Sequence, residues 1–344
     1  MLDCHLYRED LERILSADLP WESLRGRRVL VTGATGMVGS LLVDTLASMM
    51  DDHGFELIAM SRNREELERL FSIHSDHEGF RMIEHDVNEQ MDLSCDTIFH
   101  CASNTHPRLY SSDPIGTITT NVIGLRNLLE MASSGDGRFV FLSSVEVYGQ
   151  NRGDVDAFDE SYCGYIDCNT VRAGYNESKR VGEALCQAYG SQKGLDFVIP
   201  RLSRLYGPSM RLDDSKAMSQ FLLNSARGEN IVLKSKGDQF FSYCYASDAI
   251  SAILHLFFHG ESGNAYNVSG LDSDFTLADI AYELASMAGT EVVFDLPDEK
   301  ERRGYSTATK AVLDISKVKA TGWMPEVSMK DGLRRTVSSL ASRL

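Results

Sequence analysis

Short apolar runs alternate with helical patterns through about the first 150 residues, and this alternation restricts the possible folds more than any other feature. The apolar runs are rich in β-branched and aromatic residues and end at turn residues, which is typical of buried strands. Strands that alternate with helices form a parallel sheet covered on both faces. The sequence therefore predicts an α/β fold with a doubly wound parallel sheet. The expected strands cover residues 27–33, 55–62, 80–87, 95–103 and 138–149.

The alternation ends near residue 205, and this change divides the chain. Residues 1–25 carry leucine and isoleucine at helical spacing, so we expect a leader helix that docks on the fold. Residues 26–205 hold the alternating strands and helices, with a helix expected over 116–133. Residues 206–344 mix turns, short strands and helices, and we expect mainly a smaller lobe with segments that return to the core.

Charge and cysteine content narrow the function classes. The chain has 344 residues and a formal net charge of -16, which argues against a nucleic-acid backbone as partner. An anionic small substrate is compatible with this charge only where arginine and lysine gather locally. The seven cysteines form no CxxC pair, so we expect free thiols and a cytoplasmic location.

A membrane and a metal ion are not expected as partners. The apolar runs are much shorter than the roughly 20 residues that a membrane-spanning helix needs. His255 and His259 lie four residues apart, but no third ligand accompanies them in a recognisable metal-binding pattern.

Three glycines follow the first expected strand in the segment VTGATGMVGS. Gly33, Gly36 and Gly39 stand where a helical pattern begins. Glycine lets the chain turn sharply and lets a pyrophosphate approach the backbone, while the helix N-terminus supplies N–H donors. After the first strand of an alternating chain, this pattern predicts a dinucleotide site.

The residues after the second and third strands bear on which dinucleotide binds. An acidic residue after the second strand would bond the ribose 2′-hydroxyl of NAD, but the sequence has Arg62 in this region. Arg62 suits either the 2′-phosphate of NADP or a stacking contact with adenine. We expect NAD, and Arg62 keeps NADP as the alternative. Asp86, after the third strand, is either an adenine contact or a solvated strand end.

Tyr175 and Lys179 lie four residues apart at the start of a helical segment, so their side chains share one face. An ammonium group near a phenol favours the phenolate, and we therefore expect the pKa of Tyr175 to be lowered toward that of a general base. Ser144 is expected at the C-terminal end of the strand 138–149, the sheet edge at which ligands bind. Together with the glycine turn, these residues predict a catalytic set in which Lys179 also holds the nicotinamide ribose.

The segments TGATGMVG, SSVEVYG and YNESK resemble the extended short-chain dehydrogenase/reductase family, from about residue 26 to the C-terminus. The resemblance implies a Rossmann domain over 26–205 that binds NAD or NADP, and a lobe over 206–344 that binds a nucleotide-diphosphate sugar. It also implies a homodimer formed through helices that include 174–190. The cofactor-binding residues that it implies are Gly33, Thr35, Gly36, Met37, Val38, Gly39, Arg62, Asp86, Val87, Cys101, Ala102, Ser103, Asn121, Tyr175 and Lys179.

Within that family, RAGYNESKRVGE and YGPSMRLDDSKAMSQF are similar to segments of UDP-glucuronate decarboxylases. The likeness implies that Glu146 joins Ser144, Tyr175 and Lys179 in catalysis, and that the second segment closes over the nucleotide. The family's usual diphosphate-binding arginine falls at Phe241, so other arginines are candidates to replace it. The expected substrate-binding residues are Ser144, Arg204, Arg211, Lys216, Arg302 and Arg303.

A 4-keto-sugar intermediate, formed when Tyr175 takes the proton of the sugar 4-hydroxyl, leaves three fates open. A uronate loses carbon dioxide, a sugar with a C6 hydroxyl loses water, and return of hydride to the opposite face inverts C4. Val145 stands where similar dehydratases have an aspartate, which weakens dehydration, whereas Glu146 fits decarboxylation.

Decarboxylation of a UDP-uronate is therefore our leading hypothesis, and a nucleotide-sugar 4-epimerase is the alternative. Arg62 motivates a third hypothesis, an NADP-dependent nucleotide-sugar reductase. A non-catalytic sensor that binds a dinucleotide is the fourth, and the presence of Ser144, Tyr175 and Lys179 argues against it.

Overall fold

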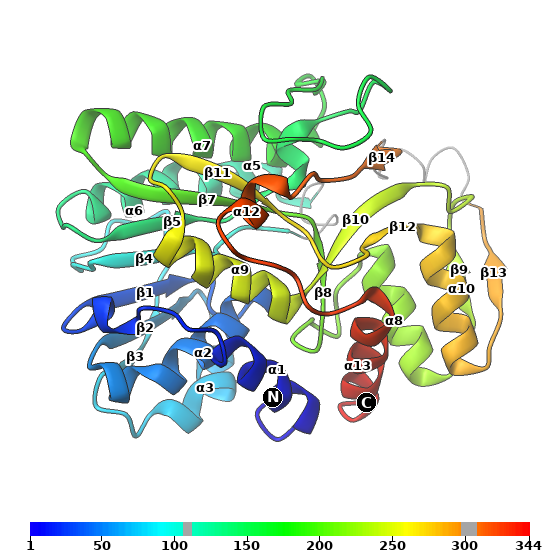
Figure 1. Ribbon diagram of the computed structural model, residues 1–344, viewed down its shortest axis with the longest axis horizontal. Coiled ribbons are helices and arrows are strands. Elements are labelled where there is room, and N and C mark those ends of the chain that lie inside the picture. The colour runs from blue at the N-terminus through cyan, green and yellow to red at the C-terminus, as the bar shows by residue number, and fades with distance from the viewer. Residues whose placement is uncertain (106–111, 297–307) are drawn as a thin grey trace.

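The computed structural model describes residues 1–105, 112–296 and 308–344. Within these residues, a parallel sheet of eight strands lies between helical layers (Figure 1). Its strand order, β11-β7-β5-β4-β1-β2-β3 with β6 beside β7, is that of a Rossmann fold and confirms the predicted fold class. The strands are β1 (Arg28–Thr32), β2 (Glu56–Ser61), β3 (Phe80–Glu84), β4 (Thr97–His100), β5 (Arg138–Phe141), β6 (Ser143–Ser144), β7 (Asp196–Leu202) and β11 (Asn264–Val268).

The two faces of the sheet carry separate hydrophobic cores, because successive side chains of a strand point in opposite directions. Val29 and Val31 of β1 pack with α2 and α9, whereas Leu30 packs in the core that includes α6 and α7. Burial on both faces explains why these strands read as continuous apolar runs. The helices of these layers are α2 (Met37–His53), α3 (Arg64–Phe71), α5 (Pro114–Thr119), α6 (Leu125–Ala132), α7 (Ala173–Lys193) and α9 (Ala246–His259).

The segment expected as one strand over 138–149 is divided. β5 ends at Phe141, β6 contains only Ser143–Ser144, and a 3-10 turn covers Val145–Tyr148. The hydroxyl of Ser144 accepts a hydrogen bond from the backbone N–H of Glu146 at 3.3 Å, which favours the turn over a longer strand. Ser144 therefore ends a strand as predicted, but the prediction of a strand at Glu146 is wrong.

The helix expected over 116–133 is also interrupted. A π-helical turn, Thr120–Gly124, separates α5 from α6. Such turns are rare and often mark functional sites. Asn121 lies in this turn and is fully buried, so the irregularity brings a predicted cofactor-binding residue into the interior.

A second lobe, formed mainly by the later half of the chain, lies beside the large sheet (Figure 1). One of its sheets has the order β12-β10-β14 with β8 beside β10, and a second pairs β13 with β9. Helices α8, α10 and α13 share a core with these strands, whereas α9 and β11 return to the layers of the large sheet. The remaining elements of this half are β8 (Arg204–Tyr206), α8 (Ala217–Arg227), β9 (Ile231–Leu233), β10 (Phe240–Tyr245), β12 (Asp274–Thr276), α10 (Leu277–Ala288), β13 (Val292–Phe294), β14 (Lys310–Ala311), α12 (Ser316–Ala320) and α13 (Met329–Ala341).

The leader helix α1 (His5–Leu15) connects the two parts and is followed by a 3-10 turn, Trp21–Leu24. Tyr7 donates a hydrogen bond to Asp44 of α2 at 2.7 Å. Asp10, on the same helix, accepts hydrogen bonds from side chains of β10 and α13. Side chains of the leader therefore form hydrogen bonds both with the helical layer of the large sheet and with the second lobe.

No helix in residues 1–105, 112–296 or 308–344 has the length and apolar character that crossing a membrane requires. The same residues contain no group of three or more histidine, cysteine, aspartate or glutamate side chains arranged to hold a metal ion. All seven cysteines lie in the described part of the chain, and each is a free thiol.

Candidate active site

The glycine turn connects β1 to α2 at the C-terminal edge of the large sheet. Gly33 has a φ of 65°, and a Cβ at this position would lie 2.7 Å from Ala102. A Cβ on Gly39 would lie 2.3 Å from the carbonyl oxygen of Gly33, so both positions require glycine. Gly36 is the N-cap of α2, and no described side chain caps that helix end. Its backbone N–H groups are therefore available to a phosphate, which fits a bound dinucleotide.

The other predicted cofactor-binding residues of this edge follow the ends of β1, β3 and β4. The hydroxyl of Thr35 lies 2.9 Å from that of Ser61 at the end of β2. The carbonyl oxygen of Met37 accepts a hydrogen bond from Ser209 at 2.9 Å, which ties the glycine turn to the second lobe. The residues that the fold gathers here are Thr35, Met37, Val38, Asp86, Val87, Cys101, Ala102 and Ser103.

A chain of hydrogen bonds links this edge to the start of α7. Ser103 donates to Asn121 Oδ1 at 2.9 Å, and Asn121 Nδ2 donates to the hydroxyl of Ser178 at 2.9 Å. Ser178 in turn donates to the carbonyl oxygen of Tyr175 at 2.9 Å. Asn121 therefore acts on the position of Tyr175 through the backbone of α7.

Tyr175, Lys179 and Ser144 lie where α7 passes the end of β6. Tyr175 is 6% exposed and Lys179 is 3% exposed. The side chains of Ser144 and Tyr175 are hydrogen-bonded to each other. Lys179 Nζ donates to the carbonyl oxygen of Leu142 at 2.8 Å and lies 4.8 Å from the centre of the Phe141 ring. The structure thus places Ser144 against Tyr175, and the buried Lys179 against the backbone between β5 and β6.

Burial dominates the pKa values of this set. It raises the pKa of Tyr175 to about 12, while the hydrogen bond with Ser144 lowers the value and the charge of Glu146 raises it. Burial also lowers the pKa of Lys179 to about 8, against the opposing effect of Cys101 and Glu183. The expectation that Lys179 brings the pKa of Tyr175 down is therefore wrong for this arrangement. The phenol stays protonated at neutral pH until a further positive charge enters the pocket.

Glu146 lies among three nitrogen donors. Asn176 Nδ2 donates to Glu146 Oε2 at 3.1 Å. Arg204 Nη2 lies 3.5 Å from Oε1, and Arg172 Nη2 lies 4.0 Å from Oε2. The Arg204 guanidinium also lies 3.5 Å from the centre of the Phe241 ring. Phe241 is the position at which the resemblance led us to expect a diphosphate-binding arginine. The positive charge of Arg204 therefore lies beside that position.

Arg62 and Asp86, the residues predicted to contact the adenosine, face each other. Arg62 Nη1 lies 4.0 Å from Asp86 Oδ2, and Arg62 Nη2 donates to Asn104 Oδ1 at 3.4 Å. Asp86 also accepts hydrogen bonds from Asn88. Arg62 is therefore directed across the sheet edge toward β3 and the segment after β4.

The remaining predicted substrate-binding residues are not grouped with Tyr175 by any contact described here. Arg211 is paired with Asp213 at 2.9 Å, and Lys216 with Asp214 at 3.2 Å. Arg302 and Arg303 lie outside the described residues. The assignments of all four to the substrate stay predictions.

Two residues beside Glu146 were missed by the sequence analysis. Arg172 and Asn176 flank Tyr175 in the segment RAGYNE, three residues before it and one after it. The signal was their nearness to the predicted base. Their partner, however, lies 30 residues from Asn176, so only the fold reveals what they bind.

Comparison with known proteins identifies an NAD-dependent, nucleotide-sugar-modifying enzyme of the extended short-chain dehydrogenase/reductase type. A model of the NAD dependent epimerase/dehydratase family matches residues 29–269, and the chain belongs to that family.

Known proteins similar to this chain include two UDP-glucuronic acid decarboxylases. Decarboxylase 6 of Arabidopsis thaliana is 33% identical over 314 residues, which cover 89% of this chain and 86% of the relative. Decarboxylase 1 of Xenopus tropicalis is 32% identical, over 90% of this chain and 71% of the relative. These identities extend the family assignment over most of the chain.

Solved structures show the same fold. The dTDP-glucose 4,6-dehydratase of Streptomyces venezuelae, solved with NAD bound, has a TM-score of 0.77 and 26% identity, and the alignment covers 91% of this chain and 96% of that one. The UDP-glucuronic acid 4-epimerase of Bacillus cereus has a TM-score of 0.78 and 22% identity, over 92% and 100% of the two chains. Dehydratases and epimerases thus share this architecture, and the reaction must be argued from the site.

Proposed function

We propose that the protein decarboxylates a UDP-uronate, with UDP-glucuronate as the best single candidate, through a 4-keto-sugar intermediate. The observation that carries the proposal is the position of Glu146, which acts electrostatically on Tyr175 and lies between the guanidinium groups of Arg172 and Arg204. Two arginines around one carboxylate leave an excess of positive charge. A sugar with its own carboxylate gains from that excess, whereas a neutral hexose does not. The relatives named as UDP-glucuronic acid decarboxylases support the same substrate.

Tyr175 is the proposed general base, assisted by Ser144 and Lys179. The glycine turn and the N-terminus of α2 would hold the pyrophosphate of the cofactor, and Lys179 its nicotinamide ribose. A bound nicotinamide would supply the hydride acceptor for oxidation of the sugar and the hydride donor for the later reduction, and its positive charge would favour the phenolate of Tyr175. Ser144 orients the sugar 4-hydroxyl, and Tyr175 Oη takes the hydroxyl proton. The same phenol gives the proton back when the 4-ketone is reduced.

The residues around Glu146 favour loss of carbon dioxide from the ketone. A 4-keto uronate is a β-keto acid, so it releases carbon dioxide without an acid to expel a leaving group. Loss of water from C6 does need such a donor, but Val145, beside Glu146, offers only a buried apolar side chain. We assign to Glu146 the transfer of the proton that C5 gains once carbon dioxide has left.

For the cofactor, we propose NAD rather than NADP. The Arg62 guanidinium is directed toward Asp86 and Asn104. A guanidinium held in this way suits stacking on adenine, and a 2′-phosphate would have to draw it from both partners. Extraction of the purified protein is expected to release NAD or NADH. Recovery of NADPH, consumed in proportion to product, would favour the reductase hypothesis instead.

We also propose a homodimer, formed through α5 and α7. These neighbouring helices expose Ile115 (75%), Ile118 (41%) and Val181 (43%), an apolar surface suited to a second copy of the same helices. Light scattering is expected to give twice the chain mass. Ile115→Glu is expected to shift the protein to monomer, whereas Ile73→Glu, at an exposed isoleucine elsewhere, is the control. The cytoplasmic location expected from the cysteines stays a prediction.

The decisive experiment is incubation with UDP-, dTDP-, CDP- and GDP-sugars, followed by mass spectrometry. The expected result is loss of carbon dioxide from UDP-glucuronate. Loss of water, or an unchanged mass with an inverted C4, would contradict the proposal in favour of dehydration or epimerisation.

Glu146→Gln tests the role of the carboxylate. The variant is expected to oxidise the sugar and lose carbon dioxide once, and then to stall with reduced cofactor, visible by absorbance, so that carbon dioxide release slows in the steady state. Glu177→Gln, at a more exposed glutamate of α7 that is paired with Arg180, is the matched control and is expected to behave as the wild type. Undiminished carbon dioxide release by Glu146→Gln would remove Glu146 from the mechanism.

A further inference from the structure

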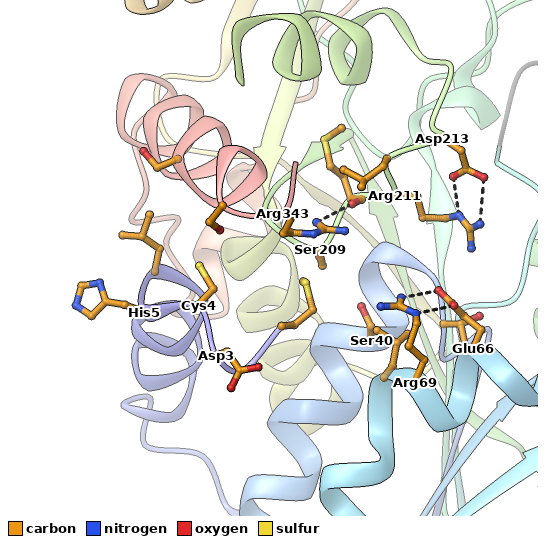
Figure 2. A pocket seen from close by; sticks show the side chains of 18 residues that line it. Asp3, Cys4, His5, Ser40, Glu66, Arg69, Ser209, Arg211, Asp213 and Arg343 are labelled. Atoms are coloured by element: carbon orange, nitrogen blue, oxygen red, sulfur yellow. Dashed lines mark hydrogen bonds and ion pairs between the residues drawn. The ribbon is translucent and has the colours of Figure 1, made fainter. Parts of the chain in front are cut away.

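A cavity of about 870 Å³, shown in Figure 2, has two of the predicted binding residues, Thr35 and Arg211, in its lining. The leader, α2, α3, the segment after β8 and the end of α13 form its walls. None of Ser144, Glu146, Tyr175, Lys179 and Arg204 lines it. A cavity of this volume is large enough for a small metabolite such as a mononucleotide.

Three arginines from three separate elements meet at this cavity. Arg69 comes from α3, Arg211 from the segment after β8, and Arg343 from the residues that follow α13. Figure 2 shows Arg343 between the leader on one side and the Arg69 and Arg211 side chains on the other. Such a gathering is notable in a chain whose formal net charge is -16.

The three guanidinium groups repel one another. The pKa of Arg343 is lowered, first by burial and then by the charge of Arg69. The charge of Arg211 acts on Arg69 in the same sense, although the hydrogen bond with Glu66 raises the pKa of Arg69 overall. Repulsion of this kind favours an anion between the guanidinium groups, in competition with the carboxylates of Asp3, Glu66 and Asp213, which also line the cavity.

Each arginine keeps hydrogen-bonding capacity for a ligand. Arg343 Nη1 makes its two hydrogen bonds to described residues, with the carbonyl oxygens of Pro208 and Met210 at 2.7 and 3.2 Å, so Nε and Nη2 remain as donors. Arg69 and Arg211 are paired with Glu66 and Asp213, carboxylates with which a ligand must compete. Hydroxyl groups complete the lining, from Thr35, Ser40, Ser209, Ser338 and Ser342.

We propose that this cavity is a second ligand site, which binds the phosphate group of a free phosphorylated small molecule while the cofactor is in place. Forked guanidinium groups and hydroxyls are the side chains that recognise phosphate oxygens. Binding here does not depend on which reaction the catalytic pocket performs, so the site is tested by binding and not by turnover.

The probe is inorganic phosphate, titrated calorimetrically into full-length protein saturated with NAD and UDP, at constant ionic strength maintained with chloride. Wild-type protein is expected to bind phosphate at one site per chain. Arg69→Gln is expected to weaken that binding roughly tenfold, because a charged donor is lost. Arg64→Gln is the matched control, since Arg64 lies on the same helix, is paired with Glu68 at 2.7 Å, and does not line the cavity.

Glu66→Gln separates ligand binding from a purely structural role. It removes the carboxylate that competes for Arg69, so phosphate is expected to bind several-fold more tightly than to wild type. A structural role alone predicts weaker or unchanged binding in both variants. No phosphate binding to wild-type protein, or equal affinities in wild type, Arg69→Gln and Glu66→Gln, would overturn the proposal.

A second source of phosphate is the cofactor itself, because Thr35 of the glycine turn also lines the cavity. If the arginines serve the 2′-phosphate of NADP, Arg69→Gln will weaken NADP binding and leave NAD binding unchanged, and phosphate will compete with NADP. That outcome would assign the position to the cofactor and overturn the proposal of a separate ligand. Phosphate binding to the protein saturated with NAD, together with NADP affinity that is independent of Arg69, supports it.

Discussion

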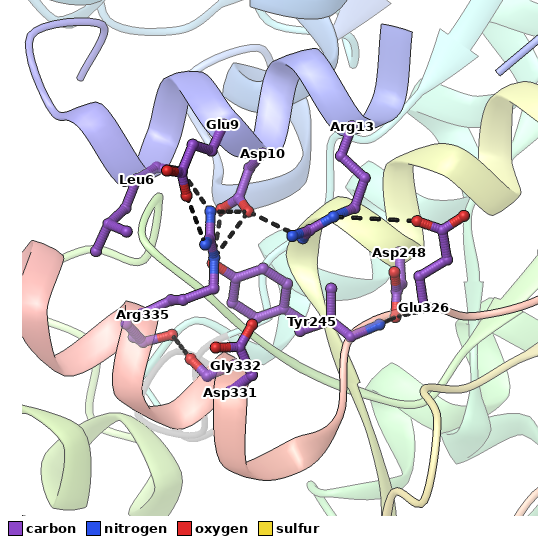
Figure 3. A network of polar contacts seen from close by, with 12 residues as sticks. Leu6, Glu9, Asp10, Arg13, Tyr245, Asp248, Glu326, Asp331, Gly332 and Arg335 are labelled. Carbon is purple, nitrogen blue, oxygen red and sulfur yellow. Dashed lines mark hydrogen bonds and ion pairs between the residues drawn. The ribbon is translucent and has the colours of Figure 1, made fainter. Parts of the chain in front are cut away.

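Two clusters of arginine and carboxylate side chains differ in how completely they are bonded. In the leader clasp, formed by Asp10, Tyr245 and Arg335, Tyr245 donates to Asp10 at 2.6 Å and Arg335 donates at 2.8 and 3.1 Å (Figure 3). Around Glu146, the nearest arginine nitrogens lie at 3.5 and 4.0 Å, and the carboxylate keeps 23% exposure. The clasp is closed, whereas the Glu146 cluster is looser and partly open to solvent.

Both clusters contain arginine and carboxylate side chains, so distance and burial, rather than residue type, separate a structural ion pair from a functional one. Asp10 is 1% exposed and Arg335 is 3% exposed, so removal of either partner leaves a buried charge that is only partly compensated, by Arg13 or by Glu9. The partly exposed arginine contacts of Glu146 contribute little to folding because water screens them. We therefore expect changes at the clasp to alter stability, and changes around the catalytic pocket to alter activity.

The largest expected effect is that of Tyr175→Phe. The change removes the proposed base, and turnover of the nucleotide sugar is expected to fall by roughly 10²–10⁴-fold. Thermal unfolding and the retained cofactor are expected to stay near wild type, because Phe keeps the ring buried. Near-normal turnover would remove Tyr175 as the base, and a large loss of stability would show that the pocket is also structural.

Arg335→Met is expected to give the largest loss of stability. It leaves buried Asp10 with only the weaker contact to Arg13 at 3.4 Å, and the free energy of unfolding should fall by up to about 3–5 kcal/mol in urea denaturation. Arg334→Met is the matched control, since the neighbouring Arg334 is 60% exposed and paired with Asp331 on the same helix. The control is expected to change stability by less than about 0.5 kcal/mol.

Turnover by the Arg334→Met and Arg335→Met variants also tests whether the leader affects the activity of the catalytic residues. If the leader only adds packing, substrate turnover by folded Arg335→Met protein should equal that of the wild type. An equal effect of Arg334→Met and Arg335→Met on unfolding would contradict the distinction between closed and open clusters.

Arg204→Gln is expected to have a smaller effect, on substrate binding. Loss of the guanidinium beside Glu146 should raise KM roughly tenfold, because a charged partner of the anionic substrate is removed. The half-buried position predicts little change in unfolding free energy. The control is Arg152→Gln, at an exposed arginine in the loop that follows the Val145–Tyr148 turn. An unchanged KM would separate Arg204 from the substrate.

The sheet was predictable from local signals, and local signals also suggested the candidate catalytic residues. The order of apolar runs fixes the strands, Gly33 and Gly39 need glycine within one turn, and Tyr175 and Lys179 lie one helical turn apart. The environment of Glu146 was not predictable in the same way, because Arg204 and Asn176 reach it from distant segments. Asp10 and Arg335 are 325 residues apart, and no pattern in either segment predicts that these two side chains pair.

The pKa of Tyr175 also depends on an environment that a local sequence pattern does not reveal. Helical spacing predicted that Lys179 and Tyr175 share one face of a helix, but spacing carries no information about burial. In the folded chain, burial raises the pKa of Tyr175 to about 12 and lowers that of Lys179 to about 8. The sign of the shift on Tyr175 therefore depended on the fold and not on the pair.

The most gradual expected effect is a pH dependence of stability that contrasts Lys179 with Arg335. Burial lowers the pKa of Arg335, but bonds to Glu9 and Asp10 raise it overall. Lys179 Nζ instead donates to a backbone carbonyl, and its pKa is about 8 in the folded chain against about 10.4 in an unfolded one. Between these values the unfolded chain binds more protons, so this group makes stability rise with pH, by at most about 1.4 kcal/mol per pH unit.

Lys179→Met removes this contribution while filling the same space. Without cofactor, the variant is expected to be more stable than the wild type at pH 7, where the buried ammonium is charged and costly. The difference should shrink as pH rises from about 8 to about 10, because folded wild-type protein then loses the charge. Urea unfolding of both proteins across this range provides the measurement. A constant difference would mean that Lys179 is as well compensated as Arg335, and the contrast between the closed clasp and the open pocket would not extend to this cation.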